Sequence, residues 1–197
     1  MKLFIQFIRS LLFAVVITFW QLFYGATLML MRPFTTLRFR LNYLATWGTL
    51  SSIITKVMVG IDYKVEGREN IPGSNVIVFS KHQSTWETNF LLTLFPQLTI
   101  ILKRELLWIP IYGWGLAATG PIAINRGSGR ASLKQINTQG KTRLEAGQSI
   151  LCFPEGTRMM PGSKPDYKPG GAMLAATTGY PVVPVALNSG ECWQKKT

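Results

Sequence analysis

Histidine and cysteine are scarce in this 197-residue chain. It has one histidine, His82, and two cysteines, Cys152 and Cys192. One histidine and two separated cysteines form no ligand set for zinc, which makes a zinc hydrolase the weakest of the functional alternatives. Two cysteines also make no disulfide scaffold, so we expect a reducing compartment.

Acidic residues are also few. The chain has 9 Asp and Glu against 21 Lys and Arg, a net charge of 21 − 9 = +12. A chain this basic needs an acidic partner, which can be nucleic acid, anionic lipid or a phosphorylated substrate. Hydrophobic residues make up 47% of the composition, and the basic residues are not gathered into one tract. We therefore expect membrane lipid as a partner and no nucleic acid.

Charge is absent from the run between Leu11 and Met31. As a helix this run would be roughly 30 Å long, the thickness of a bilayer core. It is too long for a signal peptide and no A-x-A-like site follows it. A buried core helix would have the same apolar composition, but the run has no polar face, so we favour a membrane helix. Basic residues flank both ends, which leaves open whether it spans the bilayer or is partly embedded.

A second apolar segment extends from Thr35 to Val59, and Gly60 is predicted to end it. Arg38, Arg40 and Lys56 lie where they can reach lipid phosphates. We predict two membrane-docking helices over residues 1–60 and a second domain over 61–197. A helical hairpin packed on that domain is the alternative, and both can hold together.

Beyond residue 60, predicted strands alternate with predicted helices, which indicates an α/β domain. Strands are expected over 61–65, 76–79, 98–102, 121–124, 149–153 and 182–187, and helices over 84–95, 104–118, 131–146 and 172–178. Pro96 is expected to end the first of these helices, and a loop rich in Pro and Gly is expected over 154–171.

His82 directly follows the predicted buried strand 76–79, a position where α/β sheets commonly carry active sites. Position alone means little, because a lone histidine is usually structural. Glu87, in the first turn of the next helix, can face the ring, fix its tautomer and leave the other nitrogen free as a base. Ser84 and Glu87 also match a capping box, which needs no chemistry. The sequence supports the two interpretations of Glu87 equally.

Two arginines also follow predicted strands. Arg126 comes after strand 121–124, and Arg158 ends the segment Phe-Pro-Glu-Gly-Thr-Arg that begins at Phe153. A guanidinium can bind a phosphate through two parallel hydrogen bonds, although a single arginine after a strand is often an ordinary surface residue. If these strands are neighbours in a parallel sheet, a base and an anion site converge at one edge.

These segments, in this order over residues 76–187, resemble the motif series of the glycerolipid acyltransferase family, and within it the bacterial 1-acylglycerol-3-phosphate acyltransferases. Residues 82–87 are similar to the histidine, four residues, acid motif. Residues 120–126 resemble the second motif, 153–158 the third and most specific one, and 182–185 the fourth.

The resemblance implies a glycerolipid acyltransferase-like sheet with flanking helices. It also implies that His82, oriented by Glu87, activates the sn-2 hydroxyl of 1-acylglycerol 3-phosphate (lysophosphatidic acid). An acyl group would pass from acyl-CoA or an acyl carrier protein to give phosphatidic acid, with no metal or other cofactor, at the cytoplasmic face of a bacterial inner membrane. The residues implied to hold or shape the phosphate site are Arg126, Arg158, Lys103, Glu155, Gly156 and Thr157.

The chain departs from the family pattern in three places. Glu87 stands where the family usually has Asp, and Ala123 where it usually has Phe. The chain ends at Thr197 where members commonly continue, so we expect either a short member of the family or one with its C-terminus missing. Alternative acceptors are glycerol 3-phosphate, a lysophospholipid with a head group or an ornithine-type lipid. A non-enzymatic basic membrane-binding protein would explain the charge and the anchor but not the ordered motifs.

Overall fold

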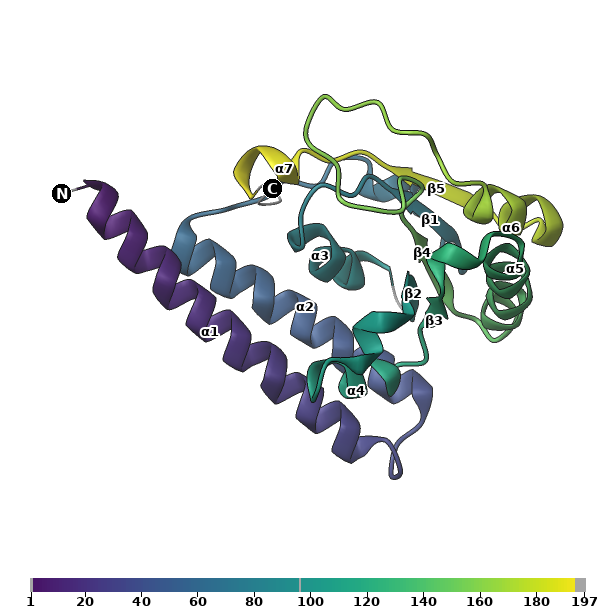
Figure 1. Ribbon diagram of the computed structural model, residues 1–197, viewed down its shortest axis with the longest axis horizontal. Helices are drawn as coiled ribbons and strands as arrows, with labels where there is room; N and C mark the ends of the chain where they lie inside the picture. The colour runs from purple at the N-terminus through teal and green to yellow at the C-terminus, as the bar shows by residue number, and fades with distance from the viewer. Residues whose placement is uncertain (1, 96, 194–197) are drawn as a thin grey trace.

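A computed structural model of the protein describes residues 2–95 and 97–193, and Pro96 therefore lies outside the described residues. The first two helices, α1 (Lys2–Met31) and α2 (Leu37–Val59), run side by side in opposite directions along one side of an α/β domain (Figure 1). The domain is built on a parallel sheet flanked by helices, as predicted.

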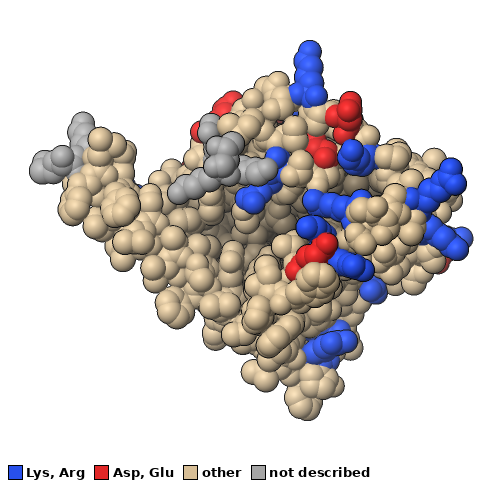
Figure 2. Space-filling model, viewed as in Figure 1, with Lys and Arg blue, Asp and Glu red and all other residues tan. Residues whose placement is uncertain are grey.

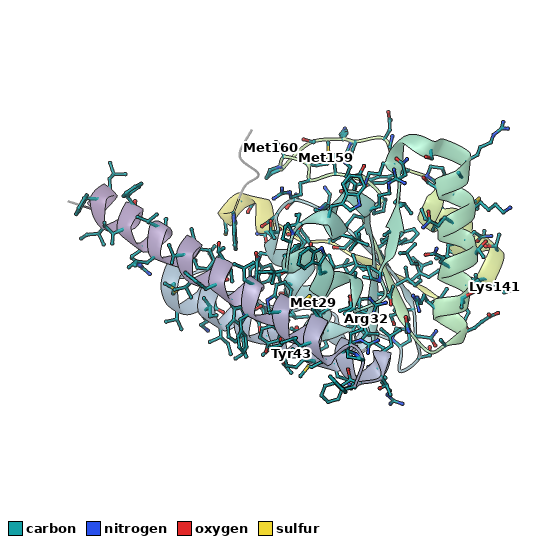
Figure 3. All side chains as sticks on the ribbon, turned by 60° about the horizontal axis from the view of Figure 1, so that its bottom comes forward. Met29, Arg32, Tyr43, Lys141, Met159 and Met160 are labelled. Atoms are coloured by element: carbon teal, nitrogen blue, oxygen red, sulfur yellow. The ribbon has the colours of Figure 1, made fainter. Side chains whose placement is uncertain are left out.

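Helix α1 contains the predicted apolar run and extends it to the N-terminal side. Its segment Leu3–Met31 is long and apolar enough to cross a membrane. The most apolar 18-residue stretch of this segment has a mean hydropathy of 2.0, and only 6% of that stretch is buried. Its C-terminal part packs differently: Tyr24 and Leu28 are buried in the core of the α/β domain. The ring of Tyr43 in α2 (Figure 3) stacks on the ring of Tyr24, with centroids 4.6 Å apart. Helix α1 therefore has an exposed apolar N-terminal part and a C-terminal part that packs on the α/β domain.

Helix α2 begins at Leu37, close to the expected start at Thr35, and ends at Val59 as predicted. The Thr36 side chain accepts a hydrogen bond from the N–H of Phe39, and Gly60 adopts φ +78° with its N–H bonded to the carbonyl of Lys56. Two basic groups expected to reach lipid instead contact the protein. Arg40 donates to the carbonyl of Ala118 at 2.6 Å, and Lys56 pairs with Asp62 at 2.7 Å.

The sheet contains five parallel strands in the order β3-β2-β4-β1-β5. Their bounds are β1 Ile77–Ser80, β2 Leu98–Lys103, β3 Ile122–Ile124, β4 Ser149–Cys152 and β5 Val182–Val185. The helices are α3 Trp86–Leu94, α4 Tyr112–Ala117, α5 Gly129–Glu145, α6 Gly170–Thr178 and α7 Ser189–Cys192, with 3₁₀ turns η1 Arg68–Asn70, η2 Arg104–Trp108 and η3 Arg126–Ser128. Helices α5 and α6 cover one face, and α3 with α2 covers the other (Figure 1).

Strands β1 and β4 are buried on both faces, as in most parallel sheets, whereas the edge strand β5 is partly exposed. Val78 and Leu151 point into a cluster that also contains residues of α1, α2 and α3. Ile77 and Ile150 point into a second cluster with residues of α5 and α6. Neighbouring positions of β1 and of β4 therefore face opposite cores, which explains why these strands have apolar residues at successive positions.

The predicted strand over 61–65 is wrong, because these residues pair with no strand. The segment packs its side chains on α3 instead: the ring of Tyr63 lies 4.3 Å from that of Phe90 and 5.7 Å from that of Trp86. A half-buried segment on a helix produces the same alternation of apolar and polar residues as a strand. The helix expected over 104–118 is interrupted near Pro110, where proline cannot donate a helical hydrogen bond, and becomes η2 and α4.

Candidate active site

Four residues that the sequence singles out line one cavity of about 310 Å³. His82 follows β1, Lys103 ends β2, Arg126 follows β3, and Arg158 lies in the loop after β4. Strand β3 is not a neighbour of β1, since β2 and β4 lie between them. The side chains still converge, because all the strands are parallel and their carboxyl ends share one edge of the sheet.

Glu87 holds His82 in one orientation. Its Oε1 lies 2.9 Å from the Nδ1 of His82, and it also accepts the backbone N–H groups of Gln83 and Ser84 at 2.8 Å each. An ionised carboxylate only accepts hydrogen bonds, so Nδ1 carries the proton and Nε2 is left as a base. One oxygen atom of Glu87 thus contacts the ring and also accepts the backbone N–H of Ser84, as a capping box requires. Its role in catalysis stays a prediction.

The carboxylate of Glu87 is fully buried. Burial opposes its ionisation, but hydrogen bonds from His82, the Ser84 backbone and Ser189 outweigh that effect and hold the pKa of Glu87 below its ordinary value. Glu87 is therefore ionised at neutral pH and can stabilise an imidazolium at His82.

The loop after β4 fixes the other side of His82. The ring of Phe153 stacks on the imidazole with centroids 4.0 Å apart and planes 19° apart. The backbone N–H of Met159 donates to the carbonyl of His82 at 2.7 Å. Figure 3 labels Met159 and Met160 in this loop. In the sequence, Phe153 stands out only as the start of a motif, and no local pattern predicts that it stacks on His82.

Polar neighbours contact the basic side chains that line the His82 cavity. Arg158 donates to the hydroxyl of Thr85 at 3.0 Å, and Lys103 lies 3.8 Å from the carboxylate of Glu105. Partial burial lowers the pKa of Arg126, while the charge of Glu105 opposes that change, and the guanidinium stays protonated. Figure 2 shows Lys and Arg gathered over the α/β domain and absent from the visible surface of most of the α1 arm.

The remaining walls of the cavity are mainly apolar. They come from α1, α2, α3 and α4 and include Tyr24, Leu28, Leu44, Trp47, Leu92 and Leu116. The cavity therefore has a basic end beside His82 and an apolar end beside the N-terminal helices. That polarity suits a ligand with an anionic head and a hydrocarbon tail.

Glu155, Gly156 and Thr157 line a neighbouring cavity of about 370 Å³, not the one that contains His82. Arg126 and Phe153 border both cavities. These three residues therefore do not line the cavity in which a ligand beside His82 would bind. Their expected role in shaping the phosphate site stays a prediction.

Cys152 is buried in β4 beside the third motif. Burial, together with the charge of Glu155, raises the pKa of its thiol to about 12. A thiol in that state is a poor nucleophile. Within residues 2–95 and 97–193, no three His, Cys, Asp or Glu residues cluster as a metal site would require.

A buried carboxylate orients a histidine, and that histidine lines a cavity with basic side chains. This arrangement could serve an enzyme that removes a proton from an anionic substrate. Comparison with known proteins narrows this class. The acyltransferase family model matches residues 62–188, and the chain belongs to that family.

Three similar proteins carry related names. The 1-acyl-sn-glycerol-3-phosphate acyltransferase of Pseudomonas aeruginosa is 41% identical over 97% of this chain and 75% of its own length. The one from Saccharomyces cerevisiae is 30% identical over 75% of this chain and 50% of its own length. The crystal structure of the LPA acyltransferase PlsC from Thermotoga maritima superimposes with a TM-score of 0.78, covering 100% of this chain and 81% of that one at 24% identity. The last comparison shows a shared fold.

Replacing Glu87 with Gln is expected to lower kcat about a hundredfold with little change in melting temperature. The amide keeps an oxygen for the backbone donors of Gln83 and Ser84 but loses the charge that stabilises protonated His82. Steady-state kinetics and thermal unfolding of the same preparation measure both quantities. Glu145→Gln, on the exposed surface of α5, is the matched control. An unchanged kcat would show that Glu87 only caps the helix.

Proposed function

We propose that this protein transfers a fatty acyl group from an acyl thioester to the sn-2 hydroxyl of 1-acylglycerol 3-phosphate, giving phosphatidic acid. The observation that carries the proposal is one cavity lined by His82, Arg126, Arg158 and an apolar wall, with Glu87 buried behind His82 and bonded to its ring. The names of the similar proteins support the same acceptor.

In the proposed reaction the phosphate of the acceptor binds Arg126 and Arg158 with Lys103 beside them, and the acyl tail lies along the apolar wall. His82 Nε2 removes the proton of the free hydroxyl, and Glu87 stabilises the imidazolium that forms. The alkoxide attacks the thioester carbonyl and gives a tetrahedral intermediate. The intermediate collapses by breaking the carbon–sulfur bond, and His82 returns the proton to the leaving thiolate.

The donor in this scheme is acyl-CoA or an acyl carrier protein, and the scheme uses no metal, flavin or nucleotide cofactor. General base catalysis by a positioned histidine typically contributes about 10²–10⁴-fold. Holding the hydroxyl and the thioester together contributes the rest through positioning.

An acceptor panel tests the proposal. The purified protein is assayed with radiolabelled acyl-CoA and lysophosphatidic acid, glycerol 3-phosphate, lysophosphatidylcholine and a lyso-ornithine lipid. We expect kcat/KM to be highest for lysophosphatidic acid, because it alone combines an unblocked phosphate with a hydrocarbon tail. A higher value for any other acceptor would reassign the substrate. Vesicle binding without transfer to any acceptor would favour a non-enzymatic lipid-binding protein.

We also place the protein on a membrane, at the cytoplasmic face of a bacterial inner membrane. The exposed apolar side chains of α1 support this location, and they continue onto η2 and α4, where Trp108, Ile109 and Trp114 are exposed. Helix α4 packs against α1, so the two helices that carry these exposed side chains adjoin. The free thiols of Cys152 and Cys192 fit a reducing compartment.

Removing apolar side chains from the exposed part of α1 is expected to release the protein from membranes. Phe4, Phe7 and Leu11 follow helical spacing and are 69%, 64% and 51% exposed. Each side chain contributes about 1.5–3 kcal/mol when fully buried, so the triple serine variant should bind vesicles more than a hundredfold more weakly. Flotation with phosphatidylethanolamine–phosphatidylglycerol vesicles measures the effect, and Tyr167→Ser, in the exposed loop after β4, is the control. Equal flotation of the triple variant and the wild type would exclude α1 as the anchor.

A further inference from the structure

The short helix α7 contacts the buried side of the His82–Glu87 pair. It follows β5, the edge strand that pairs with β1 (Figure 1). The hydroxyl of Ser189, its first residue, donates to Oε2 of Glu87 at 2.8 Å. The three other donors to this carboxylate all reach Oε1. Ser189 therefore supplies the contact that the structure gives to the second oxygen.

Helix α7 is fixed against the loop that carries His82. The backbone N–H of Gly190 donates to Oε1 of the Gln83 side chain at 3.2 Å. Gly190 is buried, and a Cβ atom at this position would lie 2.9 Å from the Cβ of Gln83. This close approach holds Ser189 at a defined distance from the loop that carries His82.

A second anchored oxygen matters because the terminal torsion of a carboxylate side chain is broad. If only Oε1 accepted hydrogen bonds, the carboxylate of Glu87 could rotate about its terminal torsion. That rotation would move the oxygen away from the position in which it accepts the Nδ1–H of His82. With donors on both oxygens, the plane of the carboxylate is fixed, and so is the direction from which it accepts the Nδ1–H of His82.

We propose that Ser189 is a positioning residue for the acyl transfer reaction: its hydroxyl orients Glu87 and, through Glu87, fixes His82 in the tautomer that leaves Nε2 free. This inference rests on the proposed function of the same site. The hydrogen bond from Ser189 also helps to keep the pKa of Glu87 low, which agrees with a role in maintaining its charge.

Kinetics of Ser189 variants test the proposal. Ser189→Ala is expected to lower kcat about tenfold while leaving the KM of both substrates within about twofold of the wild type. Ser189→Thr keeps a hydroxyl and should recover most of the loss. Asn188→Ala, which removes a bond to Glu191 in the same turn without touching Glu87, should retain wild-type kcat.

A double-mutant cycle separates positioning from a general loss of stability. If Ser189 acts through Glu87, Ser189→Ala should change kcat less than twofold in a Glu87→Gln background. A tenfold loss that persists in that background would overturn the proposal, as would wild-type kcat in the single Ser189→Ala variant.

A spectroscopic measurement makes the outcome independent of activity. His82 is the only histidine, so selective ¹⁵N labelling of histidine gives the signals of this ring alone. The wild type should show one tautomer, protonated at Nδ1, and Ser189→Ala should show a mixture of tautomers. An unchanged single tautomer in Ser189→Ala would refute positioning even if turnover fell. Absence of acyl transfer by the wild type, with this tautomer change intact, would count against the proposed function only.

Discussion

Replacing His82 with Ala is expected to lower kcat by about 10²–10⁴-fold, the range that a general base typically contributes. His82 is the only histidine, so no second imidazole can take over its role. The fold should persist, because Glu87 keeps its bonds from the Gln83 and Ser84 backbone and from Ser189. Steady-state turnover, with thermal unfolding and vesicle flotation of the same sample, measures the effect.

The neighbouring residue provides the control for this prediction. Lys81→Ala removes a side chain one position before His82, and the Lys81 backbone bond to Val185 does not depend on that side chain. Lys81→Ala should therefore retain near-wild-type kcat. A folded, membrane-bound His82→Ala protein with wild-type turnover would eliminate His82 as the base.

Replacing Arg158 or Arg126 with Lys is expected to weaken use of lysophosphatidic acid. A guanidinium can bind a phosphate through two parallel hydrogen bonds, and an ammonium group cannot reproduce that geometry. Hydrogen bonds to charged groups are worth about 1.5–3 kcal/mol, so kcat/KM for the acceptor should fall about ten- to a hundredfold. The KM for acyl-CoA should change little. Both constants are obtained by varying one substrate at saturation of the other.

The exposed Arg130 of α5 lies outside the His82 cavity, and Arg130→Lys is the control for these variants. An acceptor without a phosphate should be poor with the wild type and should lose little more in either arginine variant. A defect confined to the donor would mean that the arginines bind the phosphates of CoA, and the acceptor assignment would then depend on family membership alone.

The local features of the site could be predicted from the sequence. His82 and Glu87 lie five positions apart across the start of one helix, so their contact depends on short-range geometry alone. Arg126 and Arg158 could be placed after predicted strands because a short apolar run bounded by Gly and Pro precedes each of them. Their convergence with His82 required only that the strands be parallel.

Contacts between distant residues could not be predicted in this way. Ser189 lies 102 positions from Glu87, and no local pattern relates them. The order of the strands was equally inaccessible, as was the position of Glu155 in a separate cavity. The strand expected over 61–65 failed because periodicity alone does not show whether a half-buried segment packs on a sheet or on a helix.

The packing of α1 shows the same limit. The sequence predicts an apolar helix, but not that α4 lies directly against it. A Cβ atom at Gly115 would lie 2.3 Å from the carbonyl oxygen of Gly25, so the two backbones approach as closely as glycine permits. This contact places α1 in the wall of the cavity that contains His82, and it joins the apolar arm to the proposed active site.

The position of the new ester bond tests the central claim most directly. The purified protein is incubated with 1-acylglycerol 3-phosphate and radiolabelled acyl-CoA, and the lipid product is digested with phospholipase A2, which releases the sn-2 chain. We predict labelled phosphatidic acid from which nearly all the label is released as free fatty acid, and formation of this product about 10²–10⁴-fold more slowly by His82→Ala. Label that stays in the lysophospholipid after digestion, or equal product from His82→Ala, would contradict transfer to the sn-2 hydroxyl by this site.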